Sequence, residues 1–138
     1  RHEQLGRVFV RRGPNAFRPL RNASGLQSQL ENSGFTTVET TSLNMQQRRA
    51  IFAEARVLVA EYGAAFGNLI FCQPGTIVID LRGPSLEHDL TAANLCALLG
   101  LRYIAVLGER ARFSREGFAP DGFSVSESQL RQVLHTNT

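Results

Sequence analysis

The residues best suited to bind an anion are the three small ones at 63–65, Gly-Ala-Ala. They follow an unbroken apolar run at 57–59, which is typical of a parallel strand buried on both faces. A helical-looking stretch then reaches Phe71. A tight turn from a strand into a helix brings backbone N–H groups to one point, next to the positive end of the helix dipole, so a phosphate can bind there. The alternative is that the small residues only let the helix pack closely on the sheet.

The arginine content of the chain is the second feature that suits phosphate binding. All 15 basic residues of the 138-residue chain are arginine, none is lysine, and the formal net charge is +3. The planar guanidinium group donates several hydrogen bonds in a geometry that matches phosphate and carboxylate. Acidic residues are interspersed among the arginines, and no continuous basic face with aromatic residues between its charges is apparent. We therefore expect no nucleic-acid partner.

The remaining composition argues against a metal site and a membrane span. Cys72 and Cys96 are too few and too far apart for a zinc site or a disulfide framework, so they are interpreted as buried thiols in a reducing compartment. The histidines His2, His88 and His135 are isolated, and no Asp-x-Asp motif is present. No apolar run approaches the ~18 residues of a membrane helix, and no signal peptide opens the chain. We expect a cytoplasmic protein.

Strands and helices are expected to alternate along the chain. Runs rich in Val, Ile, Phe and Thr predict five strands, at 7–10, 35–40, 57–60, 76–80 and 102–107. Apolar spacing and N-cap residues predict helices starting at Asn22 or Ser24 and ending at Gly34, and at 44–55, 68–71, 86–99 and 126–134. Residues 108–124 are polar, contain three glycines and a proline, and are expected to be irregular.

Two of these helices come with specific expectations. The helix before the third strand is capped by Ser42 or Asn44, and Asn44 with the glutamine three residues later resembles a capping box. Met45 is expected on its buried side. In the helix at 86–99, Leu90 and Leu98 are expected to face inward.

This alternation predicts an α/β fold: a three-layer Rossmann-like domain with a mostly parallel sheet of about five strands. The third strand is expected in its centre. Ligands of such sheets bind at the carboxyl ends of the strands, near the point where strand order reverses. The loops to inspect carry Arg11 and Arg12, residues 62–65, and residues 80–82. The dinucleotide motif and the P-loop motif are absent, which disfavours an NAD enzyme and a P-loop NTPase.

Several separated motifs occur in a characteristic order. A strand is followed by Arg12, by Arg18 six residues later and by Asn22 four residues after that. Gly34-Phe35 precedes the second strand, and the next helix opens with a leucine and a glutamine at 43 and 47. The segment from Tyr62 to Gly75 reads YGAAFGNLIFCQPG, and Asp80 closes the next strand. Together these motifs resemble the C-terminal half of family 61 glycosyltransferases, with bacterial capsule-type proteins among the similar members.

The resemblance implies a function for these residues. Arg12 and Arg18 would bind the phosphates of a nucleotide-sugar donor, and Gly63 and Ala64 would place backbone N–H groups against them. Asn68 and Asp80 would contact the donor, although Asn68 could instead brace the turn and Asp80 could be a turn former. The alternative for Arg12 and Arg18 is that both are exposed on the surface without a ligand, which is the more frequent location of arginine in proteins. The transfer would be inverting, metal-independent and without a cofactor, to a glycan or protein acceptor.

The resemblance also implies one half of a GT-B architecture. Residues 1–138 would form a single Rossmann-like domain, the C-terminal donor-binding half of a longer protein, whose missing N-terminal domain would bind the acceptor. Arg1 is not an initiator Met, which fits that expectation. We expect this half by itself to bind the donor weakly and to transfer no sugar.

One departure from the family pattern affects the chemistry. Tyr62 stands where the family usually has histidine, and a phenol with an ordinary pKa near ~10 is a poor base at neutral pH. The catalytic residue therefore stays unassigned, and a degenerate binding module without transfer activity is one alternative. An unrelated flavodoxin-like regulatory domain is another. Glu61, next to Tyr62, is either a surface residue or an electrostatic partner.

Overall fold

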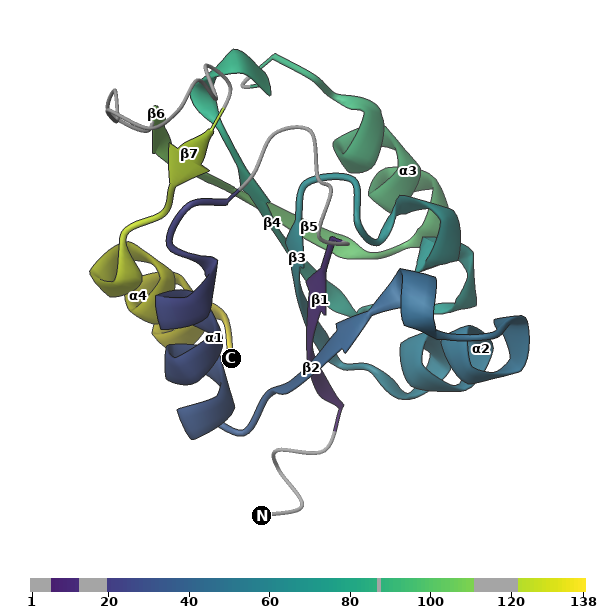
Figure 1. The fold of residues 1–138 in the computed structure, drawn as a ribbon. Helices are drawn as coiled ribbons and strands as arrows, with labels where there is room; N and C mark the ends of the chain where they lie inside the picture. The colour runs from purple at the N-terminus through teal and green to yellow at the C-terminus, as the bar shows by residue number, and fades with distance from the viewer. Residues whose placement is uncertain (1–5, 13–19, 87, 111–121) are drawn as a thin grey trace.

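A parallel five-stranded sheet forms the middle of the molecule (Figure 1). The structure is a computed structural model that describes residues 6–12, 20–86, 88–110 and 122–138. The strand order is β2-β1-β3-β4-β5, and all four neighbouring pairs are parallel. The strands are β1 (Arg7–Arg11), β2 (Thr36–Glu39), β3 (Val57–Glu61), β4 (Ile77–Arg82) and β5 (Arg102–Leu107).

Strand β3 is the central strand, as its apolar run predicts. All five of its residues are buried, and Val59 pairs with Phe9 of β1 on one side and with Ile79 of β4 on the other. A strand covered on both faces has no solvent-facing position for a polar residue, so the alternation of an edge strand is missing. The expected three-layer α/β fold is confirmed.

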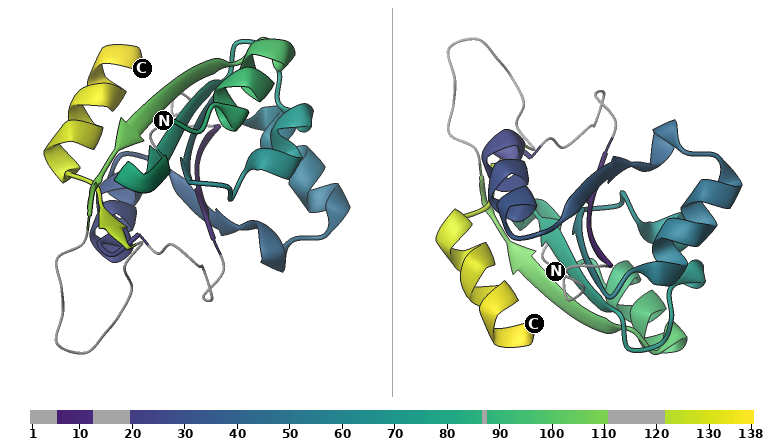
Figure 2. Two further views of the ribbon diagram at one scale, coloured as in Figure 1. Left: turned by 90° about the horizontal axis from the view of Figure 1, so that it is seen from above. Right: turned by 90° about the horizontal axis from the view of Figure 1, so that it is seen from below.

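Helices cover both faces of the sheet, as the two views of Figure 2 show. Helices α1 and α4 pack on one face, and α2, α3 and the 3₁₀ helix η3 pack on the other. A short antiparallel pair, β6 with β7, lies outside the main sheet. The bounds are α1 (Ala23–Asn32), α2 (Met45–Glu54), α3 (Thr91–Leu99), α4 (Glu127–Asn137), η2 (Thr40–Ser42), η3 (Phe66–Phe71), η4 (Pro84–Leu86), β6 (Glu109–Arg110) and β7 (Phe123–Ser124).

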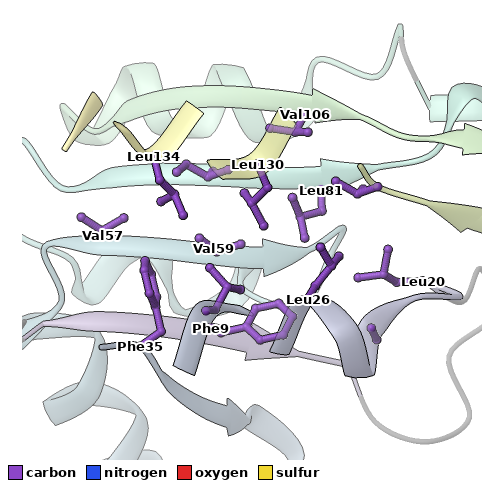
Figure 3. Close-up of a cluster of buried hydrophobic side chains, with 14 of the residues drawn as sticks. Phe9, Leu20, Leu26, Phe35, Val57, Val59, Leu81, Val106, Leu130 and Leu134 are labelled. Atoms are coloured by element: carbon purple, nitrogen blue, oxygen red, sulfur yellow. The ribbon is translucent and has the colours of Figure 1, made fainter. Parts of the chain in front are cut away.

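Each face of the sheet has its own hydrophobic core. Figure 3 shows the core under α1 and α4, where Phe9, Val59 and Leu81 of the sheet meet Leu26 and Leu130 of the two helices. The core on the opposite face holds alternate residues of the same strands together with α2, η3 and α3. Since successive strand residues point to opposite faces, one apolar strand supplies both cores. This packing fixes the strand ends where a site can form.

Three details differ from the sequence-based expectations. Helix α3 begins at Thr91, not at 86, because a 3₁₀ turn and an irregular segment come first. Leu90 lies before the helix, and the side chains of Leu90 and Leu98 are 61% and 85% exposed. Met45 is 57% exposed at the first position of α2. The cores are already filled by other residues of these helices, Phe52 in α2 and Cys96 in α3 among them.

The helix starts were predicted with mixed success. Asn44 and Gln47 form the complete capping box in front of α2. At the start of α4, the Ser126 side chain accepts a hydrogen bond from the Gln129 N–H, which is half of a capping box. The side chain of Asn22 does not cap α1. It is engaged elsewhere, with the chain segment in front of α4.

Candidate functional site

The direction of the chain across the sheet reverses between β1 and β3. From β1 the chain continues to β2 on one side, and from β3 it continues to β4 and β5 on the other side. The connections after β1 and β2 run over opposite faces, through α1 and α2. Ligands of open α/β sheets bind outside the carboxyl ends of the strands at such a point. The residues directly after β1 and at the end of β3 therefore form the candidate site.

Glu61 connects these two strand ends. Its Oε2 accepts a hydrogen bond from the backbone N–H of Arg12 at 2.7 Å, and its Oε1 lies 3.6 Å from Nε of Arg11. Nη1 of Arg11 also donates to Oε1 of Gln27 in α1 at 3.0 Å. Arg11 is thus committed to contacts within the fold, and Glu61 is an electrostatic partner, not a surface residue.

Glu61 is only 5% exposed, and burial raises the pKa of its carboxyl group above the ordinary value of 4.5. Burial penalises the charged form of an acid. The hydrogen bond from the Arg12 N–H and the charges of Arg11 and Arg12 act in the opposite direction and lower the pKa. The carboxylate is therefore held at the site by its cationic neighbours against the cost of burial.

Arg12 itself is half-buried, and its guanidinium group makes no hydrogen bond or ion pair with another described residue. Only its backbone is fixed, by Glu61. As far as the described residues go, its five N–H groups are open to a ligand beside the end of β3. Arg18, the second arginine predicted to bind phosphate, lies outside the described residues.

The turn after β3 has an open side. Gly63 adopts a φ of +82°, a left-handed conformation that favours glycine, and no atom lies within 4 Å of the position a Cβ would take. Ala64 donates its N–H to the Glu61 carbonyl oxygen at 2.9 Å, so this amide is already used within the turn. The segment that follows is the six-residue 3₁₀ helix η3 instead of an α-helix. An α-helix dipole therefore does not support anion binding here, and a contact of Gly63 with phosphate stays a prediction.

Tyr62 is held by three neighbours. Its hydroxyl donates a hydrogen bond to Oδ2 of Asp89, and its ring lies under the guanidinium group of Arg82, 5.1 Å from Cζ to the ring centroid. Phe66 contacts the same ring edge to face at 5.2 Å between centroids. Burial and the bond to Asp89 raise the pKa of Tyr62, while this bond lowers the pKa of Asp89 to about 2. Tyr62 is a neutral phenol at neutral pH and cannot act as a general base there.

Asp80 belongs to a buried polar cluster. Its Oδ2 accepts hydrogen bonds from Nε and Nη2 of Arg82 at 3.2 and 2.7 Å and from the Tyr103 hydroxyl at 2.6 Å. Arg82 donates further to Tyr103 Oη and to the carbonyl oxygens of Leu86 and Asp89. All five N–H groups of this arginine are thus used. Asp80 is not a turn former, and its carboxylate is committed to a cation that is 2% exposed.

A small cavity lies between β3, β4 and η3. Glu61, Gly63 and Asp80 are among its lining residues, so it brings two of the predicted site residues together. Its volume of about 10 Å³ is close to the space of one water molecule. A nucleotide cannot enter it and would have to lie across the strand ends. Asn68, in η3, is buried, and its backbone N–H donates to the Ala65 carbonyl oxygen at 2.9 Å within the 3₁₀ helix, so a contact of its side chain with the donor stays a prediction.

Asn22 is placed at a second, larger hollow. Its Nδ2 donates to the Val125 carbonyl oxygen at 2.6 Å, and its Oδ1 accepts from the Val125 N–H at 3.1 Å, which ties the start of α1 to the segment before α4. The hollow has a volume of about 330 Å³, and Glu109 and Glu127 contribute to its lining. Two carboxylates disfavour a phosphate there.

A sequence model of the family described as Glycosyltransferase 61 matches residues 2–79 of the chain. The chain belongs to glycosyltransferase family 61. The match contains β1, β3 and the turn with Tyr62 and Gly63, whereas Asp80 and Arg82 follow it. None of the curated proteins compared with the chain matches it.

Family membership gives the geometry a chemical context. A glycosyltransferase moves a sugar from a donor to an acceptor, so the family implies a nucleotide-sugar partner and an acceptor partner. Within the described ranges, no three His, Cys, Asp or Glu side chains group so that they could hold a metal ion. The helices among those residues are all too short or too polar to cross a bilayer.

Sequence reasoning missed Arg82, Asp89 and Tyr103, which hold Tyr62 and Asp80 in this glycosyltransferase. The loop at 80–82 was marked as a place to inspect, but the role of Arg82 was not recognised, because its five hydrogen bonds go to four acceptor atoms at four separate positions. Asp89 carries no local signal, since its contact with Tyr62 spans 27 residues. Such contacts are properties of the fold and not of a short motif.

Proposed function

We propose that the carboxyl ends of β1 and β3 bind the diphosphate of a nucleotide-sugar donor for inverting transfer to a glycan or protein acceptor. The observation that carries this proposal is the Arg12 guanidinium, unbonded to other described residues at the point where strand order reverses. The neighbouring Arg11 is neutralised by Glu61, so one positive charge of the pair is left for a ligand. Arg18 and the Gly63 N–H remain part of the proposed site, whereas the Ala64 N–H is committed to the Glu61 carbonyl oxygen.

In the proposed chemistry, Arg12 stabilises the leaving group. The acceptor oxygen attacks the anomeric carbon as the bond from that carbon to the diphosphate oxygen breaks, and the acceptor proton passes to a base. Negative charge grows on the departing nucleoside diphosphate. A fixed guanidinium stabilises that charge without a metal ion. A GT-B arrangement would supply the base and the acceptor site from a second, N-terminal domain in a cytoplasmic, bacterial polysaccharide-type enzyme.

Binding of nucleoside diphosphates tests this proposal. UDP, GDP, ADP and CDP are titrated into the protein by calorimetry, and the best of the four is then used with the variants. Arg12→Ala should weaken binding by about 1.5–3 kcal/mol, the range for hydrogen bonds to charged groups. Arg131→Ala is the matched control, because it removes the same charge from the exposed side of α4. Equal affinity of both variants would remove Arg12 from the site.

A binding module without transfer activity is the second candidate function. Tyr62 favours it, because the phenol that replaces the usual histidine is fixed by Asp89 and has a raised pKa. Binding alone does not separate the two candidates, whereas a sugar-transfer assay does. Nucleotide binding with no transfer to any acceptor, in the folded full-length protein with its N-terminal domain, would favour the binding module.

A further inference from the structure

A buried carboxylate stands at the proposed anion site. Glu61 is the last residue of β3, is 5% exposed, and precedes the turn that we propose for diphosphate. A negative charge at such a place repels a phosphate and is costly to bury. Its presence therefore calls for a role that offsets both effects.

The ladder between β1 and β3 ends just before this residue. Its last pair is Val10 with Ala60, and Arg11 pairs only with Glu39 of β2 on the other side. The N–H of Arg12 then has the Glu61 side chain as its acceptor, at 2.7 Å, where the backbone ladder offers none.

The second carboxylate oxygen reduces the electrostatic cost of this arrangement. Oε1 of Glu61 lies 3.6 Å from Nε of Arg11, an atom that is buried and has no hydrogen bond of its own among the described residues. Arg11 is in turn held by Gln27 of α1. The opposite charges of Glu61 and Arg11 compensate each other. The positive charge of the neighbouring Arg12 guanidinium is not compensated by this pair.

We infer that Glu61 is a positioning residue for Arg12. Its side chain extends the β1–β3 pairing by one residue, fixes the backbone of Arg12 at the end of β3, and so holds the Arg12 guanidinium where a donor diphosphate binds. This inference rests on the proposed function, because it assumes that Arg12 is the phosphate ligand. Positioning the Arg12 backbone requires only an acceptor atom at this place, so an uncharged acceptor of the same shape can replace the carboxylate in this role.

The experiment compares three substitutions by calorimetry with the nucleoside diphosphate that binds best. Glu61→Gln keeps an acceptor for the Arg12 N–H and should stay within about threefold of wild type. Glu61→Leu removes the acceptor and should weaken binding about tenfold, the size of one lost hydrogen bond. Glu39→Leu is the control, because it removes a carboxylate from the end of β2, where Glu39 makes no contact with the Arg12 N–H. Its affinity should be unchanged.

A double-mutant cycle separates positioning from a general loss of structure. In the background Arg12→Ala, the change Glu61→Leu should have almost no further effect on affinity, because the group that it positions is gone. An equal tenfold loss in both backgrounds would overturn the inference. So would wild-type affinity of Glu61→Leu, or a loss in Glu61→Gln as large as in Glu61→Leu.

Failure of the proposed function looks different. If Arg12→Ala binds as wild type does, Arg12 is not the phosphate ligand, and both the proposed function and this inference are wrong. If Glu61→Leu does not fold, amide hydrogen exchange in wild type and Glu61→Gln takes its place. The Arg12 amide should be protected in both proteins, and fast exchange at Arg12 in wild type would overturn the inference.

Discussion

At the scale of single residues, Tyr62 combines a fixed position with a poor capacity for proton transfer. Its hydroxyl donates to Asp89, its ring lies beside Arg82, and its pKa is raised by burial and by the Asp89 bond. Because its proton is donated to Asp89, the Tyr62 hydroxyl oxygen can still accept a hydrogen bond from a sugar hydroxyl. It cannot exchange a proton near pH 7 as imidazole does.

The first residue-scale prediction follows from that difference. Tyr62→His should raise sugar transfer by about tenfold or more, because general acid–base catalysis typically contributes at least that factor. Transfer is measured with the full-length protein, on one donor and one acceptor under identical conditions, with Tyr62→Phe as the variant that lacks any titratable group. If the histidine variant is slower than wild type, Tyr62 has a role of its own that the enzyme depends on.

Glu61 supplies a second prediction, on the pH dependence of stability. Its pKa is raised in the folded state, so the folded protein binds this proton more tightly than the unfolded chain does. The stabilisation is complete below the ordinary pKa of 4.5 and is lost as pH rises through the raised value. The free energy of unfolding of wild type, minus that of Glu61→Gln, should therefore be larger at pH 4.5 than at pH 7. Urea unfolding at both pH values measures it, and a difference that grows with pH would contradict the raised pKa.

At the scale of elements, local patterns predicted the strands well and some helix boundaries poorly. The apolar run of β3 and the Asn44 capping box are complete within a few neighbouring residues, so a sequence displays them. The segment before α3 also has contacts with a more distant residue: Arg82 donates to the carbonyl oxygens of Leu86 and Asp89, while Oδ1 of Asp89 accepts the Thr91 N–H at the helix start. The sequence around 86–90 gives no sign of these contacts.

The cluster around Arg82 predicts a large effect on stability. Arg82→Met leaves Asp80 as a buried, unpaired carboxylate and should lower the free energy of unfolding by about 3–5 kcal/mol. Tyr103→Phe removes one donor to the same carboxylate and should cost about 1–2 kcal/mol. Denaturant titration measures both, with Arg131→Met on exposed α4 as the control, for which a change below about 0.5 kcal/mol is expected. Equal stability of Arg82→Met and wild type would show that the cluster does not hold the strand ends.

At the scale of the whole molecule, strand order is what turns separate motifs into one site. Alternating strands and helices predicted the parallel sheet, and the sheet brings the end of β1 beside the end of β3. The sequence marked Arg12, Tyr62 and Gly63 as interesting but could not show the Glu61 bond that joins them. Likewise, the Asn22 bonds to Val125 span 103 residues, a distance over which no periodic pattern operates.

Charge at this scale leads to the last prediction, that donor binding needs no divalent cation. The chain carries a formal net charge of +3, all of its basic residues are arginine, and the proposed site places Arg12 and Arg18 against the diphosphate. Two guanidinium groups supply the positive charge that Mg²⁺ or Mn²⁺ supplies at other nucleotide sites. Affinity for the nucleoside diphosphate should be the same in EDTA and in millimolar Mg²⁺ or Mn²⁺, and it should fall as salt screens the charges. A loss of binding in EDTA that Mn²⁺ restores, with Arg12→Ala unaffected, would instead assign the diphosphate to a metal ion.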